Sequence, residues 1–509
     1  MARRGQKVVV IGAGFGGLSS ALALNAAGFD VTVYERHNAP GGKAAEVTVD
    51  GVGFDTGPSL LTMPEVLTRL EQVAHVDLWN RLELRTMSPA FEYIWPDGTR
   101  LDVHHALNDT LDSVRATFSA EDADELGDFA EYARLIWETS APHFVLGDAP
   151  SVRGLVTKDL MTLMSVGKID AQRSMHSAIT RRISNPFLRE ILMRYATYNG
   201  SDVRKAPATL NCIAHVELGE GGYGVVGGMH AVAEALYRAA VEAGVNFHFE
   251  RTVSGVECRS KRITGIRLAD GKLAEADAVV CNADVAHLFR RLLPGCETRA
   301  AAVRADASMS GYTFVVNAAP NGDRRPHSVL FGTRYLSEFE AIFDRATVTA
   351  EPTIYACDQS KTHARAGWAD GDPLFVMINT PPVDRMLNPP DWREVRDAAC
   401  RRLADAGVCQ PNPLVMWERT PSGLERQFPD SGGSIYGQSS NSVFAAFRRP
   451  SNKVPDFPGL YLASGGAHPG GGVPLCILSG LAAARQLVSD QGSKSTWSKQ
   501  MQRFAFGRR

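Results

Sequence analysis

The sequence predicts an α/β protein in which a domain with a parallel β-sheet carries an inserted α+β domain and a helical subdomain. Three observations predict this fold. A β-branched apolar strand, a glycine-rich turn and a helix follow one another in residues 7–27. Units of the same kind return at residues 227–281 and 459–488, far along the chain. The segments between them have helical or antiparallel patterns, so the main domain is expected to assemble from three separated pieces.

Length and composition indicate a soluble enzyme of two or three interleaved domains. The 509 residues are 44% hydrophobic and 22% charged, which is ordinary for a globular protein. The 54 basic and 56 acidic residues leave a net charge of −2, too little to attract nucleic acid, which we exclude as a partner. No two of the eight cysteines have CxxC spacing, so we expect no metal site, no disulfide framework and a reducing cytoplasm.

The first strand–turn–helix unit has the spacing of a dinucleotide-binding fingerprint. Residues 7–11 (KVVVI) form the strand, and residues 12–17 (GAGFGG) supply G-x-G-x-x-G. Gly12 permits the tight turn, and Gly14 lets the backbone approach a pyrophosphate. Gly17 lets the helix and the strand pack closely.

The next strand, residues 30–35, ends in a carboxylate. Glu35 can accept hydrogen bonds from an adenosine ribose, and Arg36 beside it is a further candidate contact. Strand, turn, helix, strand and acid in this order are much more specific than the glycines alone, so a turn without a ligand is the weaker alternative. The unit predicts a Rossmann-type domain.

A second glycine-rich turn indicates that the cofactor is FAD and not NAD. Residues 40–44 (PGGKA) follow the acidic strand end, and residues 54–59 (FDTGPS) come shortly afterwards. FAD extends past its pyrophosphate and needs small residues beside the ribityl chain and the ring, whereas NAD does not. The turn resembles the second motif of glutathione-reductase-type proteins, so we expect a Rossmann-type, glutathione-reductase-like FAD-binding domain. The candidate FAD-binding positions in these two segments are Gly42, Lys43, Gly57, Pro58 and Ser59.

Turn signals and strand patterns divide the remaining chain. We expect the FAD-binding domain in residues 1–70, 206–290 and 445–490, and a basic tail in residues 491–509. The substrate-binding domain is expected in residues 71–205 and 291–444, with a helical part that is a candidate for membrane contact. The second and third pieces of the FAD-binding domain add the candidate cofactor contacts Val253, Asn282, Gly465, Gly466 and Val473.

The segment at residues 459–480 has the most specific pattern in the chain. It contains GLYLA, then HPGGGVP, then Ser479-Gly480, and it resembles the C-terminal signature of bacterial carotenoid desaturases of the phytoene-desaturase type. Ser464 stands where that signature usually has glycine. Further similar stretches lie at residues 194–200, 206–208, 219–229, 277–284 and 327–332. The resemblance spans nearly the whole chain and is closest to 1-hydroxycarotenoid 3,4-desaturases and methoxyneurosporene dehydrogenases.

This resemblance implies an FAD-dependent enzyme that introduces a C=C bond into an acyclic, 1-hydroxylated carotenoid by hydride transfer to flavin. Phytoene desaturase, a carotenoid ketolase and a flavin amine oxidase are alternative enzymes. A carrier with the same fold but no flavin is the non-enzymatic alternative. Oxygen or a quinone is the implied electron acceptor, since the chain has one dinucleotide fingerprint.

Carotenoids do not dissolve in water, so we expect peripheral association with the cytoplasmic face of the inner membrane. The sequence contains no run of 18 consecutive apolar residues, so we expect no membrane-spanning helix. The Met- and Leu-rich stretch at residues 155–169 and the basic, aromatic tail at 491–509 are the candidate contacts. The alternatives are a core helix face and a solvated chain end.

Three side chains are candidates for a catalytic role. His468 lies within the glycine-rich loop that is expected to pass the flavin, where it could handle a proton or hold the turn by bonding a backbone carbonyl. Glu131 and Arg134 are spaced to form an ion pair on one helix face. This pair could meet a hydroxylated carotenoid end, or it could be an exposed salt bridge of little consequence.

Overall fold

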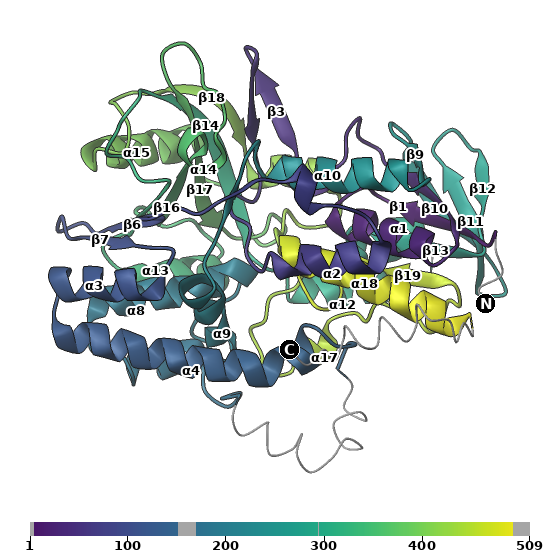
Figure 1. Ribbon diagram of the computed structural model, residues 1–509, viewed down its shortest axis with the longest axis horizontal. Coiled ribbons are helices and arrows are strands. Elements are labelled where there is room, and N and C mark those ends of the chain that lie inside the picture. Colours follow the sequence, from purple (N-terminus) through teal and green to yellow (C-terminus); the bar gives the residue numbers. More distant parts are fainter. Residues whose placement is uncertain (1–4, 151–168, 294, 492–509) are drawn as a thin grey trace.

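The computed structural model describes residues 5–150, 169–293 and 295–491. Its first unit, at the right of Figure 1, is a five-stranded sheet in which every neighbouring pair of strands is parallel. The strand order is β19 (Leu460–Leu462), β13 (Ala278–Cys281), β1 (Lys7–Ile11), β2 (Asp30–Tyr34) and β9 (Asn246–His248). The strands therefore come from three distant parts of the chain, as the sequence predicts.

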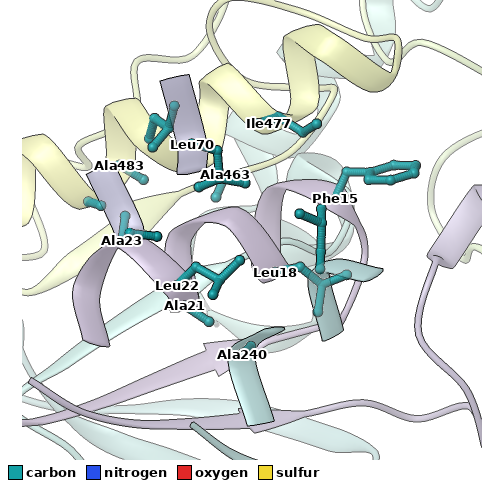
Figure 2. Packing of buried hydrophobic residues seen from close by; sticks show 14 of the residues in the cluster. Phe15, Leu18, Ala21, Leu22, Ala23, Leu70, Ala240, Ala463, Ile477 and Ala483 are labelled. Carbon is teal, nitrogen blue, oxygen red and sulfur yellow. The ribbon is translucent and has the colours of Figure 1, made fainter. Parts of the chain in front are cut away.

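Both faces of this sheet are covered, because alternate residues of β1 enter different cores. Val8 and Val10 pack with the helices α1 (Phe15–Ala26), α2 (Glu65–Ala74), α10 (Met229–Glu242) and α18 (Val473–Asp490). Figure 2 shows small side chains of α1, among them Ala21 and Ala23, packed between α18 and Ala240 of α10.

The opposite face of the parallel sheet packs against an antiparallel one. Val9 and Ile11 of β1 contact the core of the three-stranded sheet β10 (Val253–Arg259), β11 (Arg262–Leu268) and β12 (Leu273–Glu275). A central strand of a parallel sheet is covered on both faces, so its side chains on both sides must be apolar.

The second unit is a seven-stranded sheet at the left of Figure 1. Its order is β18 (Leu414–Arg419), β14 (Ser310–Ala318), β17 (Asp372–Thr380), β16 (Ile354–Asp358), β15 (His327–Leu330), β6 (Phe91–Ile94) and β7 (Arg100–Val103). The pair β6–β15 is parallel and the other pairs are antiparallel. The hairpin β6–β7 thus adds two strands from an early insertion to a sheet made mainly by a later one.

The two faces of the seven-stranded sheet meet different parts of the molecule. One face packs on α15 (Trp392–Asp405) through Leu403 and Phe314. On the other face Val315 and Phe375 contact Phe54, at the start of the second glycine-rich segment. The inner face of this sheet therefore borders the predicted cofactor site.

A helical layer covers the β6 end of the seven-stranded sheet, and Tyr93 and Phe331 lie in its core. The layer consists of α3 (Leu107–Thr117), α4 (Ala120–Phe144), α7 (Met175–Thr180) and α8 (Pro186–Arg194). In Figure 1, α3, α4 and α8 lie below this sheet.

Small elements complete the described chain. The two-stranded sheets are β3 (Glu46–Val49) with β4 (Val52–Asp55), and β5 (Leu84–Arg85) with β8 (Gly224–Val225). The short helices and turns are η1 (Gly42–Ala44), η2 (Trp79–Arg81), η3 (Tyr195–Asn199), η4 (Ala208–Asn211), α9 (Cys212–Ala214), η5 (His215–Gly219), α11 (Val285–His287), η6 (Leu288–Leu292), α12 (Glu297–Ala305), α13 (Tyr335–Glu340), η7 (Ala341–Arg345), α14 (Gln359–His363), α16 (Pro421–Gln427) and α17 (Ala445–Arg448).

The predicted fold class is confirmed, with one displaced boundary. The apolar run at residues 478–488 predicts the last helix there, but α18 begins already at Val473, because Gly472 at φ 108° ends the loop and Pro474 fits the first turn. The exact domain limits stay predictions. Residues 155–168 and 492–509, which contain most of the two candidate membrane contacts, lie outside the described residues. Within the described ranges no helix is both long enough and apolar enough to cross a membrane.

Candidate active site

The first glycine-rich turn joins three strand ends. Gly12 has φ 95°, and a Cβ on Gly17 would lie 2.0 Å from the Gly12 carbonyl oxygen. The Gly14 N–H donates to Asn282 Oδ1 at 3.0 Å, and the Asn282 amide in turn donates to the Ala463 carbonyl. Asn282 therefore ties the turn after β1 to the ends of β13 and β19.

Glu35 is buried at the end of β2. One carboxylate oxygen accepts from the Ala13 N–H at 2.7 Å and the other from the His37 N–H at 2.8 Å. Arg36 places its guanidinium 5.9 Å from the ring centre of Phe428, and burial lowers its pKa although Glu35 opposes that shift. The carboxylate is thus held rigidly beside the fingerprint turn, where the ribose of a dinucleotide is expected.

The second glycine-rich turn lies directly on the first. The Gly41 N–H donates to the Ala13 carbonyl at 2.9 Å, and a Cβ on Gly42 would be 3.4 Å from the Gly14 Cα. A Cβ on Gly57 would lie 2.0 Å from the Lys43 carbonyl oxygen. The structure therefore brings the two predicted cofactor turns together, with no room for side chains between them.

Lys43 is a buried cation beside these turns. Its Nζ donates to the Ser434 and Ile435 carbonyls at 2.9 and 3.0 Å. Burial lowers the pKa of Lys43, whereas the nearby carboxylate of Asp284 raises it. The backbone carbonyls and Asp284 together keep a positive charge next to the turn that the sequence assigns to FAD.

Ser59 connects the cofactor turn to the substrate domain. Burial raises the pKa of Tyr355 and of Cys357 on β16, and the neighbouring Ser59 hydroxyl opposes both shifts. Ser59 directly follows Gly57 and Pro58, so the turn passes along the inner face of the seven-stranded sheet. Val253, also a candidate cofactor contact, is buried at the start of β10.

The glycine-rich loop at residues 464–472 lies against a second loop. A Cβ on Gly471 would be 2.9 Å from the Tyr436 Cα, and a Cβ on Gly437 would be 2.8 Å from the Gly466 Cα. Gly465 approaches the Gly471 Cα in the same way, at 3.2 Å. Val473 is buried where the loop enters α18. Glycines therefore let this loop and the loop around Tyr436 pack closely, and the position of the loop beside the flavin stays a prediction.

His468 is buried within that loop. Its Nε2 lies 3.1 Å from the Gly147 carbonyl oxygen, which can only accept, so Nε2 carries the proton. Burial lowers the pKa of His468 to about 4, and the ring is neutral at pH 7. The structure thus shows the backbone-bonded arrangement, through Nε2, and a proton-handling role stays a prediction.

Glu131 and Arg134 form the predicted ion pair on α4. The shortest N–O distance is 2.6 Å, and Arg134 also bonds Glu138 at 2.5 Å. The side chains of Glu131 and Arg134 are 55% and 39% exposed. Exposed pairs of this kind contribute little to stability, and their role toward a substrate stays a prediction.

Sequence reasoning missed a buried polar cluster in the substrate domain. It consists of Arg194, Tyr195, Tyr198, Glu217 and Tyr355, and we call it the Glu217 cluster. Its members come from α8, η3, η5 and β16. The run at residues 194–200 attracts notice as a motif, but no pattern in the sequence links Glu217 or Tyr355 to it.

Comparisons with known proteins agree with this geometry. Residues 15–488 match the family described as flavin containing amine oxidoreductase. The chain is 34% identical to the hydroxyneurosporene desaturase of Rubrivivax gelatinosus, over 97% of this chain and 95% of the relative. It is 31% identical to a 1-hydroxycarotenoid 3,4-desaturase of a Flavobacterium species, over 93% and 97%.

The solved structures support the fold. An oxidoreductase from Methanosarcina mazei superposes with a TM-score of 0.63 at 16% identity, over 93% of this chain and 99% of that one. The family match and the two glycine-rich turns identify FAD as the cofactor. The chain therefore belongs to the flavin containing amine oxidoreductase family, alongside bacterial carotenoid desaturases.

Proposed function

We propose that this protein desaturates an acyclic, 1-hydroxylated carotenoid with FAD as its hydride acceptor. The observation that carries the proposal is the near full-length similarity to two desaturases of hydroxylated carotenoids. The geometry supports it, because the predicted cofactor turn at Ser59 adjoins the aromatic interior of the substrate domain. An apolar polyene needs such a dry, aromatic surface more than it needs charged groups.

The residues present fit FAD. The fingerprint glycines and the buried Glu35 would hold the ribose and pyrophosphate side of the cofactor, and Lys43 would lie on the side of the ribityl chain and the ring. The glycine-rich segments at residues 464–472 and 57–59 would lie beside the ring. When bound, FAD supplies a hydride acceptor for a carbon next to the conjugated chain.

The protein's own contribution is to bind, orient and keep out water. Tyr93, Phe331 and Phe339 belong to one buried core, and Tyr93 stacks on Phe331 at 5.9 Å between ring centres. Because these side chains are fully buried, they support the site from behind and would keep its lining rigid around a bound substrate. The same dry core would keep water away from a cation formed on the polyene.

Production of the enzyme in bacteria that accumulate defined carotenoids tests the proposal. The strains would accumulate phytoene, neurosporene, lycopene or 1-hydroxylated derivatives, and pigments would be measured by absorption after extraction. We expect a red shift for the hydroxylated substrates, because each added double bond lengthens the polyene. Conversion of phytoene, or no change with any carotenoid, would contradict the proposal.

The bond from the buried His468 to a backbone carbonyl favours a positioning role for this side chain over a role in proton transfer. We expect His468→Ala to lose FAD content and activity in parallel, because the bond that joins the loop to the Gly147 carbonyl is gone. His468→Gln can still donate to that carbonyl and should recover most of both. Flavin absorbance per mole of protein, measured beside turnover, checks this prediction, and full FAD content with lost turnover would point to proton handling.

The same histidine predicts a pH dependence of stability. Its pKa in the folded protein is lowered to about 4, while an unfolded histidine titrates near about 6.5. The neutral ring therefore stabilises the fold above about pH 6.5, and this contribution is lost as pH falls toward 4. Thermal unfolding between pH 4 and 8 should show a smaller decrease at low pH for His468→Gln than for the unchanged protein.

We also propose oxygen or a membrane quinone as the electron acceptor, and peripheral contact with the inner membrane. Phe444 is 64% exposed and lies immediately before α17. Phe447 of α17 contacts Phe144 near the end of α4, with ring centres 6.1 Å apart. Apolar groups at such a surface can enter the headgroup region of a bilayer.

Flotation with anionic liposomes tests the membrane contact. We expect Phe444→Ser to reduce the bound fraction several-fold, because its ring no longer enters the lipid. Leu387→Ser is the matched control, since Leu387 is 88% exposed but lies on the loop after β17. Equal loss of binding in both variants, or in neither, would contradict a contact at α17.

Reoxidation of the reduced flavin by air or by an added quinone separates the two acceptors.

A further inference from the structure

The Glu217 cluster contains polar groups that the protein itself does not satisfy. Arg194, Tyr195 and Glu217 are buried. Neither carboxylate oxygen of Glu217 accepts a hydrogen bond of good geometry, and the Tyr195 hydroxyl has no partner. Burial raises the pKa of Glu217, and the charge of Arg194 and the nearby hydroxyls of Tyr198 and Tyr195 oppose that shift. Buried polar groups without partners are costly and rare, so they call for an external explanation.

Arg194 does not supply the hydrogen bonds that Glu217 and Tyr195 lack. Its guanidinium donates to the hydroxyls of Tyr198 at 3.1 Å and Tyr93 at 3.4 Å. It also lies over the rings of Tyr198 and Tyr355, at 5.2 and 5.6 Å from their centres. Among the described residues no N–O contact within 4.0 Å joins it to Glu217. Arg194 therefore orients the tyrosines and leaves the carboxyl group free for another partner.

The cluster lies where the cofactor turn meets the substrate sheet. The Tyr355 hydroxyl bonds His327 Nδ1 at 2.9 Å, and Tyr355 packs on the same hydrophobic core as Leu60, three residues after Gly57. Burial raises the pKa of Tyr436, on the loop that packs against Gly471, and the charge of Arg194 opposes that shift. Unlike Glu217, Tyr198 and Tyr355 keep part of their surface accessible. The cluster thus lies between the two segments assigned to FAD.

The chemistry of a hydroxylated carotenoid places a polar group at the same location. In a 1-hydroxycarotenoid that gains a 3,4 double bond, only one carbon separates C1, which bears the hydroxyl, from the reacting carbon C3. The hydroxyl must therefore lie beside the flavin whenever the reacting bond does. In an otherwise apolar pocket that hydroxyl loses its bonds to water and needs a protein partner.

We propose that the Glu217 cluster binds the tertiary hydroxyl group of a 1-hydroxycarotenoid and selects it over the carotenoid that lacks the hydroxyl. Glu217 forms one hydrogen bond with this hydroxyl, and the Tyr195 hydroxyl forms a second bond with it. Sites built to bond a substrate hydroxyl discriminate strongly against the analogue without it, because the protein's groups then stay unpaired. The proposal rests on the proposed function and names the group that decides the substrate.

Paired substrates test the proposal. FAD-loaded enzyme in liposomes is given either 1-hydroxyneurosporene or neurosporene, and kcat and KM are measured with FAD content and the unfolding midpoint. We expect Glu217→Leu to lower kcat/KM for the hydroxylated substrate about 10- to 100-fold, mainly through KM, and to leave kcat/KM for neurosporene within about twofold. Tyr195→Phe should shift the same ratio less, and it will fold because it removes a hydroxyl that has no partner.

Glu338→Gln is the matched control. Glu338 is also buried in the substrate domain, but its carboxylate accepts from the Thr353 N–H at 2.8 Å and from Asn379. We expect it to leave the preference between the two carotenoids unchanged. An equal loss for both substrates in Glu217→Leu, or an unchanged preference in both Glu217→Leu and Tyr195→Phe, would overturn the proposal. Desaturation of neither carotenoid by the unchanged enzyme would instead contradict the proposed function, and this proposal with it.

Discussion

Replacing Gly17 by alanine is expected to yield a protein that purifies without its yellow colour. The added Cβ would lie 2.0 Å from the Gly12 carbonyl oxygen and 3.3 Å from the Asn282 Cβ. Both chain segments are held by the parallel sheet, so the helix α1 must move away from β1. Overpacking of this kind costs about 1–3 kcal/mol or more in stability, and it displaces the amide groups that face the pyrophosphate.

FAD titration followed by flavin fluorescence measures the effect of Gly17→Ala, and we expect affinity to fall at least about 100-fold, which corresponds to about 2.7 kcal/mol. Gly322→Ala is the control, because a Cβ there meets nothing within 4 Å and the backbone does not need glycine. A Gly17→Ala protein with unchanged FAD affinity and unfolding midpoint would show that the observed packing of α1 on β1 is not required.

Arg324→Leu is expected to produce the largest loss of stability among single changes in the substrate domain. The side chains of Arg324 and Asp358 are both 0% exposed and are joined at 2.7 Å. Arg324 also donates to the Ala319 and Val408 carbonyls, each at 3.2 Å. The substitution leaves the Asp358 carboxylate buried without its cation, and breaking one side of a buried ion pair costs about 3–5 kcal/mol.

Urea unfolding of Arg324→Leu, followed by tryptophan fluorescence, measures this loss. The neighbouring Arg325 provides the control, since its pair with Asp102 is 34% and 29% exposed. We expect Arg325→Leu to cost less than about 1 kcal/mol, because solvent screens such a pair. Similar unfolding free energies for the two variants would contradict the assignment of Arg324 as a buried structural cation.

The parallel-sheet domain could be predicted because its signals are local. A β-branched strand, a glycine turn and an amphipathic or apolar helix reflect steric and hydrophobic preferences that act within about thirty residues. Gly12 is required by its φ of 95° and Gly17 by the Gly12 carbonyl of the same turn, whereas Gly14 makes room for the Asn282 side chain after the distant strand β13. The strands at residues 263–268 and 273–275 follow in the same way from the hairpin signal at residues 270–271.

Interactions between distant segments could not be predicted. The ion pair of Glu131 and Arg134 follows from helical spacing, but its exposure depends on which face of α4 packs inward. The bond from His468 to Gly147 joins residues 321 positions apart. Periodic patterns in the sequence do not predict such a contact, because it depends on how whole helices and strands pack together.

The sequence by itself determined that this chain is a flavoprotein, through the segment from Val8 to Glu35 and the turn at Gly41 and Gly42. The tertiary structure decided which polar side chains come together in the substrate domain. Glu217 and Tyr355 lie 138 positions apart in the chain, and they come together only because η5 and β16 pack on one hydrophobic core. The physical reason is that cofactor binding uses backbone geometry, which is local, whereas a buried polar pocket is made by side chains from separate elements once they exclude water.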